Sequence, residues 1–257
     1  MKQLCIGNFD YERWGHGYGT HRRTDHRIAA QIHRSLGSAR TVLNVGAGAG
    51  SYEPTDRWVL AVEPSAAMRA RRPPHLAPAI AAVAEDLPLD GGSVEAAMAT
   101  VTVHHWADPA RGLRELRRVS RGPVVILTFD PDALDRFWLA DYVPELIKAE
   151  QNRFPSITAI CSALGADTDV RSVAVPIDCL DGFTEAYYAR PERFLDEDVR
   201  RSQSAWAFVH PDVEARFIAA LGSDLGSGAW DEQYGSWRSR PQFHGALRLI
   251  IGQPDHR

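Results

Sequence analysis

Short apolar runs recur along the first half of the chain, separated by segments of helical periodicity. Four of them are Thr41–Val45, Trp58–Val62, Val94–Val103 and Pro123–Phe129, and each is apolar at most of its positions. Continuous apolar runs of this length predict strands that are covered on both faces, which is the usual condition of a parallel sheet. Ala79–Ala84 is a weaker run of the same kind, and we expect a further strand there.

The segments between these runs carry helix start and stop signals. Asp25 and Ser65 are candidate N-caps, and Asp108 is a third, followed by Pro109 at the first helical position. The helix after Asp25 is expected to end at Gly37. Strands that alternate with helices predict an α/β fold with helices on both faces of the sheet.

The second half of the chain is less regular. Ala133–Leu164 is predicted to be helical with a break near Pro155, Val170–Ile177 to be a strand, and Leu247–Ile251 to be the last strand. The aromatic and acidic segment 181–240 lies between these two strands, so we expect a helical cap over the sheet rather than a separate domain. The predicted fold is therefore Rossmann-like and doubly wound, with a mostly parallel seven-stranded sheet and a cap inserted before the last strand.

Composition narrows the function classes. The chain has 257 residues, a formal charge of -4, 44% apolar residues and 24% charged residues, values that are ordinary for a globular protein. The slightly acidic balance does not favour nucleic-acid binding, which requires a basic face, and the basic cluster 69–72 is interpreted as a solvated helix end. With no signal-peptide pattern and no membrane-spanning apolar run, we expect a cytoplasmic protein without a membrane partner.

The cysteines give no sign of a metal or redox centre. Cys5, Cys161 and Cys179 are far apart, and no CxxC pair is present. We expect three reduced thiols and no bound metal.

The most informative stretch is the glycine-rich turn Gly46–Gly50, which follows the run Thr41–Val45. Glycine lets the backbone approach a ligand closely because it has no Cβ. A phosphate-binding loop would need a lysine that is missing here. A dinucleotide-binding turn would need glycine at Ser51 and a long helix, for which Pro54 leaves little room. Two interpretations remain. The stretch is either a GxGxG turn that binds a cofactor without phosphates, or a glycine-rich surface turn with no ligand.

Glu63 ends the second apolar run, at the sheet edge where ligands of open α/β sheets bind. A carboxylate there can accept hydrogen bonds from both hydroxyls of a ribose. The alternative is an acid that is stabilised by the N-terminus of the following helix.

Five stretches of the chain resemble motifs of class I S-adenosylmethionine-dependent methyltransferases of the small-molecule type 11 branch. They follow one another in the same order as in that family. They are VLNVGAGAG, LAVEPS, AEDLPLDGGSVEAAMATVTVHHWADP, LRELRRVSRG and VVILTFDP, within about residues 41–131. The resemblance implies S-adenosyl-L-methionine as cofactor, S-adenosyl-L-homocysteine as product, and a small-molecule acceptor. Whether that acceptor is methylated on oxygen, nitrogen or carbon, and the oligomeric state, stay open.

The resemblance also assigns cofactor contacts. The turn would face the methionine portion, Glu63 would bind the ribose, and other residues would flank the adenine or line the floor under the sulfonium. Asn44 stands where the family often has an acid, and it could accept from the turn's amides and donate to a carbonyl. The implied contacts within the matched stretches are Asn44, Gly46, Ala47, Gly48, Glu63, Pro64, Met68, Ala84, Glu85, Thr100 and Val101.

The resemblance divides one methyltransferase domain, 1–257, into four parts. Residues 1–24 would form a lid in which Tyr18 lies against the cofactor and Arg22 binds its carboxylate, although a packed irregular terminus is the alternative. The other parts are a cofactor-binding half at 25–132, a substrate half with the cap at 133–244, and the last strand and tail at 245–257. Some cap aromatics are expected to wall a substrate pocket, and most to form core.

His104 and His105 follow the fourth strand, beside the expected position of the transferred methyl group. In an extended segment their side chains would diverge, and we expect His105 to face the pocket and His104 to face neighbouring loops. A neutral imidazole with a pKa near the working pH could take a proton from the acceptor. The alternative is a structural histidine pair. A methyltransferase-like module that binds without catalysis is the alternative function, since a fold does not determine an activity.

Overall fold

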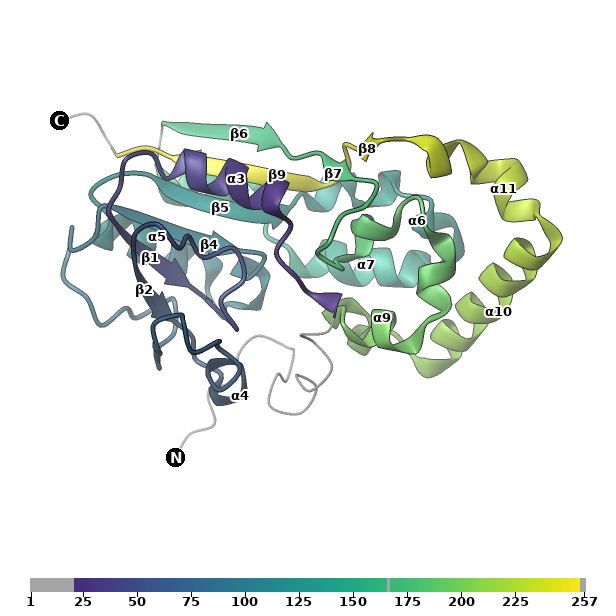
Figure 1. Ribbon diagram of the computed structural model, residues 1–257, viewed down its shortest axis with the longest axis horizontal. Coiled ribbons are helices and arrows are strands. Elements are labelled where there is room, and N and C mark those ends of the chain that lie inside the picture. Colours follow the sequence, from purple (N-terminus) through teal and green to yellow (C-terminus); the bar gives the residue numbers. More distant parts are fainter. Residues whose placement is uncertain (1–20, 166, 255–257) are drawn as a thin grey trace.

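The computed structural model describes residues 21–165 and 167–254, and its centre is a seven-stranded sheet in the order β3-β2-β1-β4-β5-β9-β6. Neighbouring strands are parallel except where β9 pairs antiparallel with both β5 and β6, so the mostly parallel sheet is confirmed (Figure 1). The strands are β1 Thr41–Val45, β2 Trp58–Val62, β3 Ala79–Ile80, β4 Ala96–Thr100, β5 Val124–Phe129, β6 Thr168–Ser172 and β9 Leu247–Gly252.

Three details of the sheet differ from the sequence-based expectation. The third strand is only two residues long, and the fourth ends at Thr100, where the backbone turns into a 3-10 helix, η2, at Val103–His105. The expected strand Val170–Ile177 is divided, because its second part, β7 (Val175–Pro176), leaves the sheet and pairs with β8 (Gln242–Phe243). The chain between β1 and β2 forms turns and no helix.

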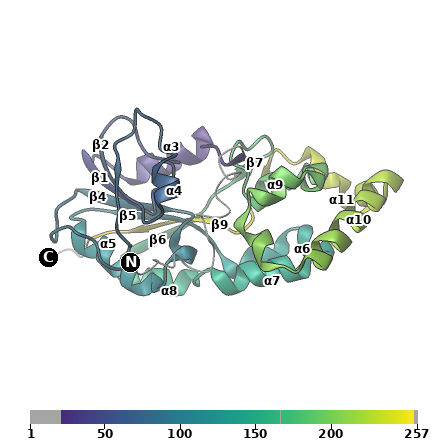
Figure 2. The same cartoon turned by 90° about the horizontal axis from the view of Figure 1, so that it is seen from below.

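Helices cover both faces of the sheet (Figure 2). Helix α3 (His26–Ser35) packs on one face, and α5 (Pro109–Val119) and α8 (Ile157–Leu164) pack on the other. Successive strand residues alternate between the two cores: Val42, Met98 and Val125 lie on the α3 side, and Leu43, Ala97 and Ile126 lie on the α5 and α8 side. This alternation explains why the strands are apolar at consecutive positions.

A cap of short helices extends beyond the carboxyl end of β5 (Figure 1). Its elements before β6 are η3 Pro131–Arg136, α6 Leu139–Tyr142 and α7 Pro144–Arg153. Its elements between β6 and β9 are η4 Thr184–Tyr187, η5 Pro191–Leu195, α9 Glu197–Arg201, η6 Ser204–Phe208, α10 Pro211–Ser227, α11 Ala229–Tyr234 and η7 Gly235–Ser239. The expected break near Pro155 separates α7 from α8, and the insertion before the last strand is confirmed.

Aromatic side chains form the core of this cap. Trp230, Tyr188, Phe137, Phe194 and Phe217 are among the largest fully buried side chains of the described residues. Their rings contact one another and their neighbours at centroid distances from 5.0 to 6.5 Å, mostly tilted or edge to face, as aromatic pairs prefer. The aromatic residues of the second half therefore serve mainly as core.

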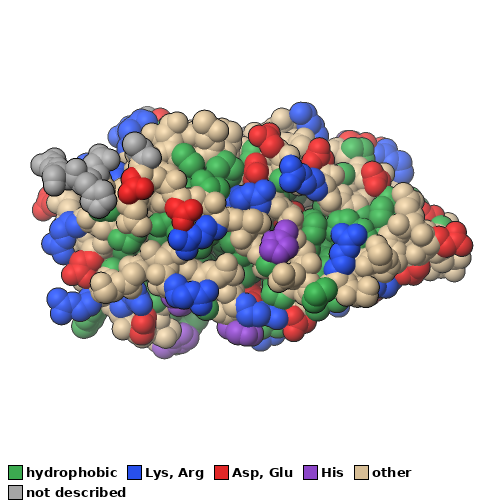
Figure 3. Space-filling view, turned by 90° about the horizontal axis from the view of Figure 1, so that it is seen from above, with side chains coloured by type: hydrophobic (Ala, Val, Ile, Leu, Met, Phe, Trp, Pro, Cys, Tyr) green, Lys and Arg blue, Asp and Glu red, His purple; other side chains and the backbone are tan. Residues whose placement is uncertain are grey.

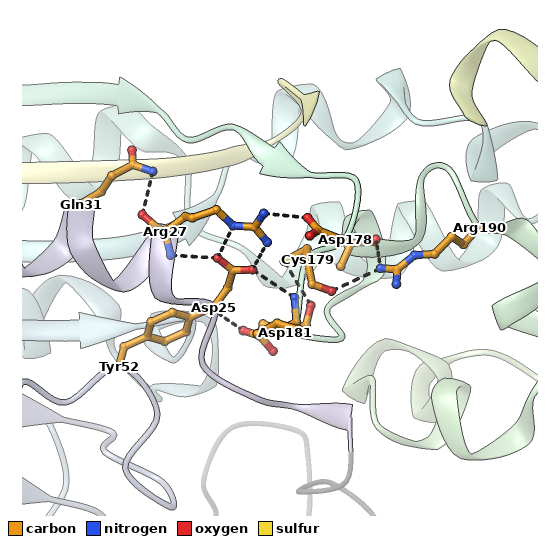
Figure 4. Close-up of polar contacts among 10 residues, drawn as sticks. Asp25, Arg27, Gln31, Tyr52, Asp178, Cys179, Asp181 and Arg190 are labelled. Carbon is orange, nitrogen blue, oxygen red and sulfur yellow. Dashed lines mark hydrogen bonds and ion pairs between the residues drawn. The ribbon is translucent and has the colours of Figure 1, made fainter. Parts of the chain in front are cut away.

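Two buried carboxylates connect the sheet half to the cap (Figure 4). Asp25 caps α3 by accepting from the N–H of Arg27 at 3.0 Å, and its other oxygen accepts from the N–H of Leu180 at 3.1 Å. Asp181 accepts from the hydroxyl of Tyr52 at 2.8 Å and from Nε of Arg22 at 2.6 Å. Residues far apart in the sequence are thus joined at the base of the cap.

The surface and the helices bear on possible partners. On the face shown in Figure 3, basic and acidic side chains of the described residues are interspersed rather than sorted by sign. Within residues 21–165 and 167–254, no helix has both the length and the apolar character that a bilayer crossing requires.

We predict that Asp25→Ala lowers the free energy of unfolding by about 3 kcal/mol, because it removes a helix cap and leaves the N–H of Leu180 without its buried acceptor. Asp178→Ala is the matched control, since Asp25 and Asp178 both form an ion pair with the Arg27 side chain, but the side chain of Asp178 is 74% exposed. That change should cost under about 1 kcal/mol. Urea unfolding of both variants checks this, and equal losses would contradict a special role for the buried carboxylate.

Candidate active site

A cleft of about 770 Å³ lies at the carboxyl ends of β1, β2 and β4. Tyr18 lies outside the described residues, and nearly every other residue that the sequence assigned to a cofactor lines this cleft. These are Arg22, Gly46, Ala47, Gly48, Glu63, Pro64, Met68, Ala84, Glu85, Thr100 and Val101, together with His105. Asn44 does not line it. We call this space the first cleft.

The glycine turn is held against the end of β2. The N–H groups of Gly46 and Ala47 both donate to the carbonyl oxygen of Val62, at 2.9 and 3.0 Å. Gly46 has φ of +67° and Gly48 has φ of +51°, a conformation that favours glycine. A Cβ on Gly46 would lie 2.1 Å from the Oγ1 of Thr102. Glycine is therefore required at Gly46 by the protein's own packing as well as by any ligand.

Glu63 organises the turn from the other side. One carboxylate oxygen accepts from the N–H of Gly48 and the other from the N–H of Ser65, both at 2.8 Å. Burial raises the pKa of Glu63, and the bonds from Ser65 and Gly48 oppose that shift. A carboxylate can accept about four hydrogen bonds, so each oxygen keeps capacity toward the cleft that it lines. Glu63 can therefore bind a ligand while it also accepts from Ser65 at the start of the following helix.

Asn44 belongs to a buried polar cluster behind the turn, which corrects its expected role. Its Nδ2 donates to Glu53 at 3.0 Å, and the turn's Gly48 amide is bound by Glu63 instead. Glu53 forms a bidentate ion pair with Arg72 at 2.9 and 2.8 Å, and the two side chains are 1% and 3% exposed. The interpretation of cluster 69–72 as a solvated helix end is therefore wrong for Arg72.

Sequence reasoning missed this Glu53–Arg72 pair. Both residues lie outside the motif positions that carried the resemblance, and an arginine next to Pro73 gives no local sign that it is buried. Their separation along the chain, 19 positions, follows no helical or strand period.

Val101 occupies a strained position at the end of β4. Its φ is +50°, which is rare for a β-branched residue, and its N–H donates to the carbonyl of Leu127 at 2.7 Å. Such strain concentrates at functional sites. Val101 and Arg22 line both the first cleft and a second, smaller cavity.

This second cavity, of about 40 Å³, lies between the carboxyl ends of β4 and β5 and the cap. Its apolar walls include Phe129, Phe137, Phe154 and Phe183. Phe183 belongs to the aromatic segment 181–240, from which some pocket-lining residues were expected. Polar side chains that line it include His104, Glu150 and Glu185.

The two histidines lie side by side, so the expectation that they diverge is wrong. Their ring centroids are 3.9 Å apart because η2 replaces the expected extended segment. His105 lines the first cleft, as expected, and His104 lines the second cavity. Burial lowers the pKa of His105 to about 3 and that of His104 well below its usual value, so both rings are neutral at neutral pH. A pKa near the working pH is thus not found.

The sequence and the fold both resemble those of known proteins. Residues 43–126 match the family described as a methyltransferase domain. A putative methyltransferase from an antibiotic biosynthesis pathway of Anabaena variabilis has a similar structure, with a TM-score of 0.82 and 28% identity over 90% of this chain and 98% of that one. The chain is therefore similar to methyltransferases, by its sequence over residues 43–126 and by its fold over most of its length. The resemblance to methyltransferases and the Rossmann-like fold class, both expected from the sequence, are confirmed.

Other known proteins are similar to this chain in fold or over part of the sequence. The chain is similar in fold to the YcgJ protein of Bacillus subtilis, with a TM-score of 0.53 and 17% identity over 90% of this chain and 99% of that one. Uncharacterised methyltransferases of Mycobacterium tuberculosis and Mycobacterium bovis are 39% identical over 94 residues. That match spans 33% of this chain and 37% of those relatives, so it covers little over a third of their length.

Glu185 is a further polar residue that sequence reasoning missed. It lies in η4 of the cap, is 1% exposed, and accepts from the N–H of Ala246 at 2.7 Å. Its other oxygen, Oε2, has no hydrogen-bond partner in the described part of the chain. Burial raises the pKa of Glu185 to about 7, against the opposing effects of the Ala246 N–H, of Arg248 and of the Leu247 N–H. Nothing in its local sequence distinguishes it from the exposed acids of the cap.

We predict that Glu185 lowers stability as the pH rises. Its pKa is about 7 in the folded state and about 4.5 in an unfolded chain, so the protonated form stabilises the fold below pH 4.5. That stability is lost as the pH rises through 7, by about 3 kcal/mol in total. Glu185→Gln should remove the dependence.

Urea unfolding of the wild type and Glu185→Gln between pH 4.5 and 8 checks this. The variant should gain about 3 kcal/mol relative to the wild type over that range. Glu192→Gln, at a carboxylate whose side chain is 53% exposed, should show no such gain. A constant difference between Glu185→Gln and wild type would contradict a raised pKa.

Proposed function

We propose that the chain is an S-adenosylmethionine-dependent methyltransferase that acts on a small organic acceptor. The observation that carries this is the first cleft, where the glycine turn and Glu63 meet at the carboxyl edge of the sheet. The cleft adjoins the second cavity at Val101 and Arg22. Two adjoining spaces suit a reaction between two molecules, because methyl transfer needs both held in one geometry.

The residues of the first cleft fit this cofactor. Its volume, about 770 Å³, lies in the range of small-molecule sites. Glu63 would bind the ribose hydroxyls, Pro64 and Met68 would flank the adenine, and Ala84 and Glu85 would lie at its edge. Gly46, Ala47 and Gly48 would face the methionine portion, with Tyr18 and Arg22 over it. The bound cofactor supplies a methyl carbon that is activated by its sulfonium.

The chain's own residues would orient the reactants and exclude water. Thr100 and Val101 would form the floor of the cleft, and Arg22 is held in place by Asp181. His105 would orient the acceptor through hydrogen bonding. With a pKa of about 3 it is a poor proton acceptor at neutral pH, so we do not assign it general-base catalysis.

The setting follows from the same proposal. A small-molecule acceptor agrees with the antibiotic pathway named for the Anabaena variabilis protein. Cys161 and Cys179 are free thiols, which supports a reducing, cytoplasmic location. We also propose that the four parts expected from the sequence act as one domain, with residues 1–24 as the lid.

We predict that the protein binds S-adenosylhomocysteine with a micromolar Kd, about -8 kcal/mol. Gly48→Val should weaken binding at least about 100-fold, because a branched side chain would enter the cleft at a φ of +51°. Gly37→Val is the matched control: its φ is +60°, and it ends α3 away from the first cleft.

Isothermal titration calorimetry of the three proteins decides the matter. Gly37→Val should carry a similar backbone strain and keep its affinity. If Gly48→Val binds as the wild type does, the turn is not part of the site. If the wild type binds S-adenosylhomocysteine and no acceptor is ever methylated, the alternative of a non-catalytic module is favoured.

We predict that Glu63 binds the ribose. The wild type should bind S-adenosylhomocysteine about 10-fold or more tightly than its 2′-deoxy analogue, the range for a hydrogen bond to a charged group. Glu63→Ala should bind both weakly and without preference. Because Glu63 also supports Gly48 and Ser65, loss of affinity alone is ambiguous, and the preference is the decisive measurement. A variant that still prefers the ribose compound would contradict the role.

A further inference from the structure

We propose that the second cavity binds the ammonium group of an amine-bearing acceptor, with the Glu185 carboxylate as its counter-ion. That the occupant is the methyl acceptor rests on the proposed function, but the ammonium site itself does not. The proposal concerns the group that anchors the acceptor, and it is independent of which atom receives the methyl group.

The charges around the cavity leave Glu185 unbalanced. Arg22 is bound to Asp181 at 2.6 Å, and Arg153 is bound to Glu150 at 2.5 Å, so these charges are matched in pairs. Arg248, the cation that acts on Glu185 through space, pairs with Asp130 at 3.1 Å. Glu185 has no ion-pair partner among the described residues. An ionised Glu185 therefore gives the cavity one uncompensated negative charge.

A buried oxygen of Glu185 is also available for a hydrogen bond. The Ala246 N–H occupies one oxygen, whereas the other has no partner within the described chain. Burying an acceptor without a partner costs about 1–3 kcal/mol or more when it is charged. The buried Nδ1 of His104 likewise has no hydrogen-bond partner among the described residues. Two unpartnered polar groups in one cavity indicate a polar occupant.

The walls of the cavity suit a cation. Phe129 lies 5.6 Å from Phe154 and 5.4 Å from Phe183, measured between ring centroids, and all three rings line the cavity. Aromatic rings attract cations through their electron-rich faces, most strongly where water is excluded. Opposite-charge recognition by Glu185 and attraction by the rings would act on the same ammonium group.

Size limits the group that enters. A volume of about 40 Å³ corresponds to roughly three water molecules, which is room for an ammonium with one or two carbons. The rest of the acceptor would pass Val101 and Arg22, which line both spaces, toward the first cleft.

Other chemical classes fit less well. A carboxylate or phosphate would face the Glu185 charge, and the arginines nearby are already paired. A neutral alcohol could bond to Glu185 and His104 but would leave the buried charge uncompensated. An ammonium satisfies both the charge and the hydrogen bond.

The test uses the full chain with saturating S-adenosylhomocysteine at about pH 8 and small probes of equal size. Ethylammonium should bind with a Kd on the order of millimolar, as expected for three heavy atoms, and ethanol should bind at least about 10-fold more weakly. Ligand-observed NMR titrations measure both. Glu185→Gln should weaken ethylammonium binding at least about 10-fold, whereas Glu192→Gln, outside the cavity, should not.

A second variant tests the site independently, in case Glu185→Gln disturbs the fold. Phe183→Leu should keep the fold and weaken ethylammonium binding relative to ethanol, because it removes one aromatic face. Tighter binding of ethanol than of ethylammonium, or equal ethylammonium binding in wild type and Glu185→Gln, would overturn the ammonium site.

The outcomes separate this proposal from the proposed function. If S-adenosylhomocysteine binds to the first cleft and ethylammonium shows no Glu185-dependent binding, the ammonium site is wrong and the cofactor proposal stands. If ethylammonium binds with the expected dependence on Glu185 but S-adenosylhomocysteine does not bind, the site stands and the methyltransferase proposal fails.

Discussion

The arrangement of the two cavities depends on the hydrogen bonds that the buried carboxylate of Asp181 accepts. It accepts from Tyr52, which follows the glycine turn, and from Arg22, which lines both cavities. Asp181 itself comes from the segment that leads into the cap, and it is 2% exposed. A buried carboxylate needs such donors, so the turn, the chain before α3 and the cap must meet at one point. Of these two donors to Asp181, Tyr52 lines the first cleft and Arg22 lines both spaces.

Charge is distributed differently in the two spaces. At the first cleft, Glu53 lines the wall and forms a buried pair with Arg72, Asn44 is their neutral neighbour, and Glu63 accepts hydrogen bonds from backbone amides. In the second cavity, Glu185 has an oxygen without a partner in the described residues. The first cleft therefore has polar groups whose positions are already fixed by hydrogen bonds. The second cavity has a carboxylate oxygen that lacks a hydrogen-bond donor. This contrast is what supports a cofactor in one and a charged acceptor group in the other.

Neighbouring residues at the end of β4 separate the two spaces. Val101 is held with a positive φ by its bond to Leu127, and η2 then places His105 toward one cavity and His104 toward the other. Because the two rings are buried and in contact, neither gains a proton at neutral pH. The histidines are therefore a neutral polar wall between the cofactor side and the acceptor side.

The sequence by itself determined the sheet, its helical coverage and the lining of the first cleft. These follow from short-range patterns: consecutive apolar residues in strands, Asp25 and Asp108 as caps, and glycines where the backbone has positive φ. Only the tertiary structure decided which polar residues are buried together. The Glu53–Arg72 pair, the contact of Asp181 with Tyr52, and the position of Glu185 under the last strand join residues that are 19, 129 and 61 positions apart. Their chemistry depends on burial and on partners from other elements, and no local pattern encodes either.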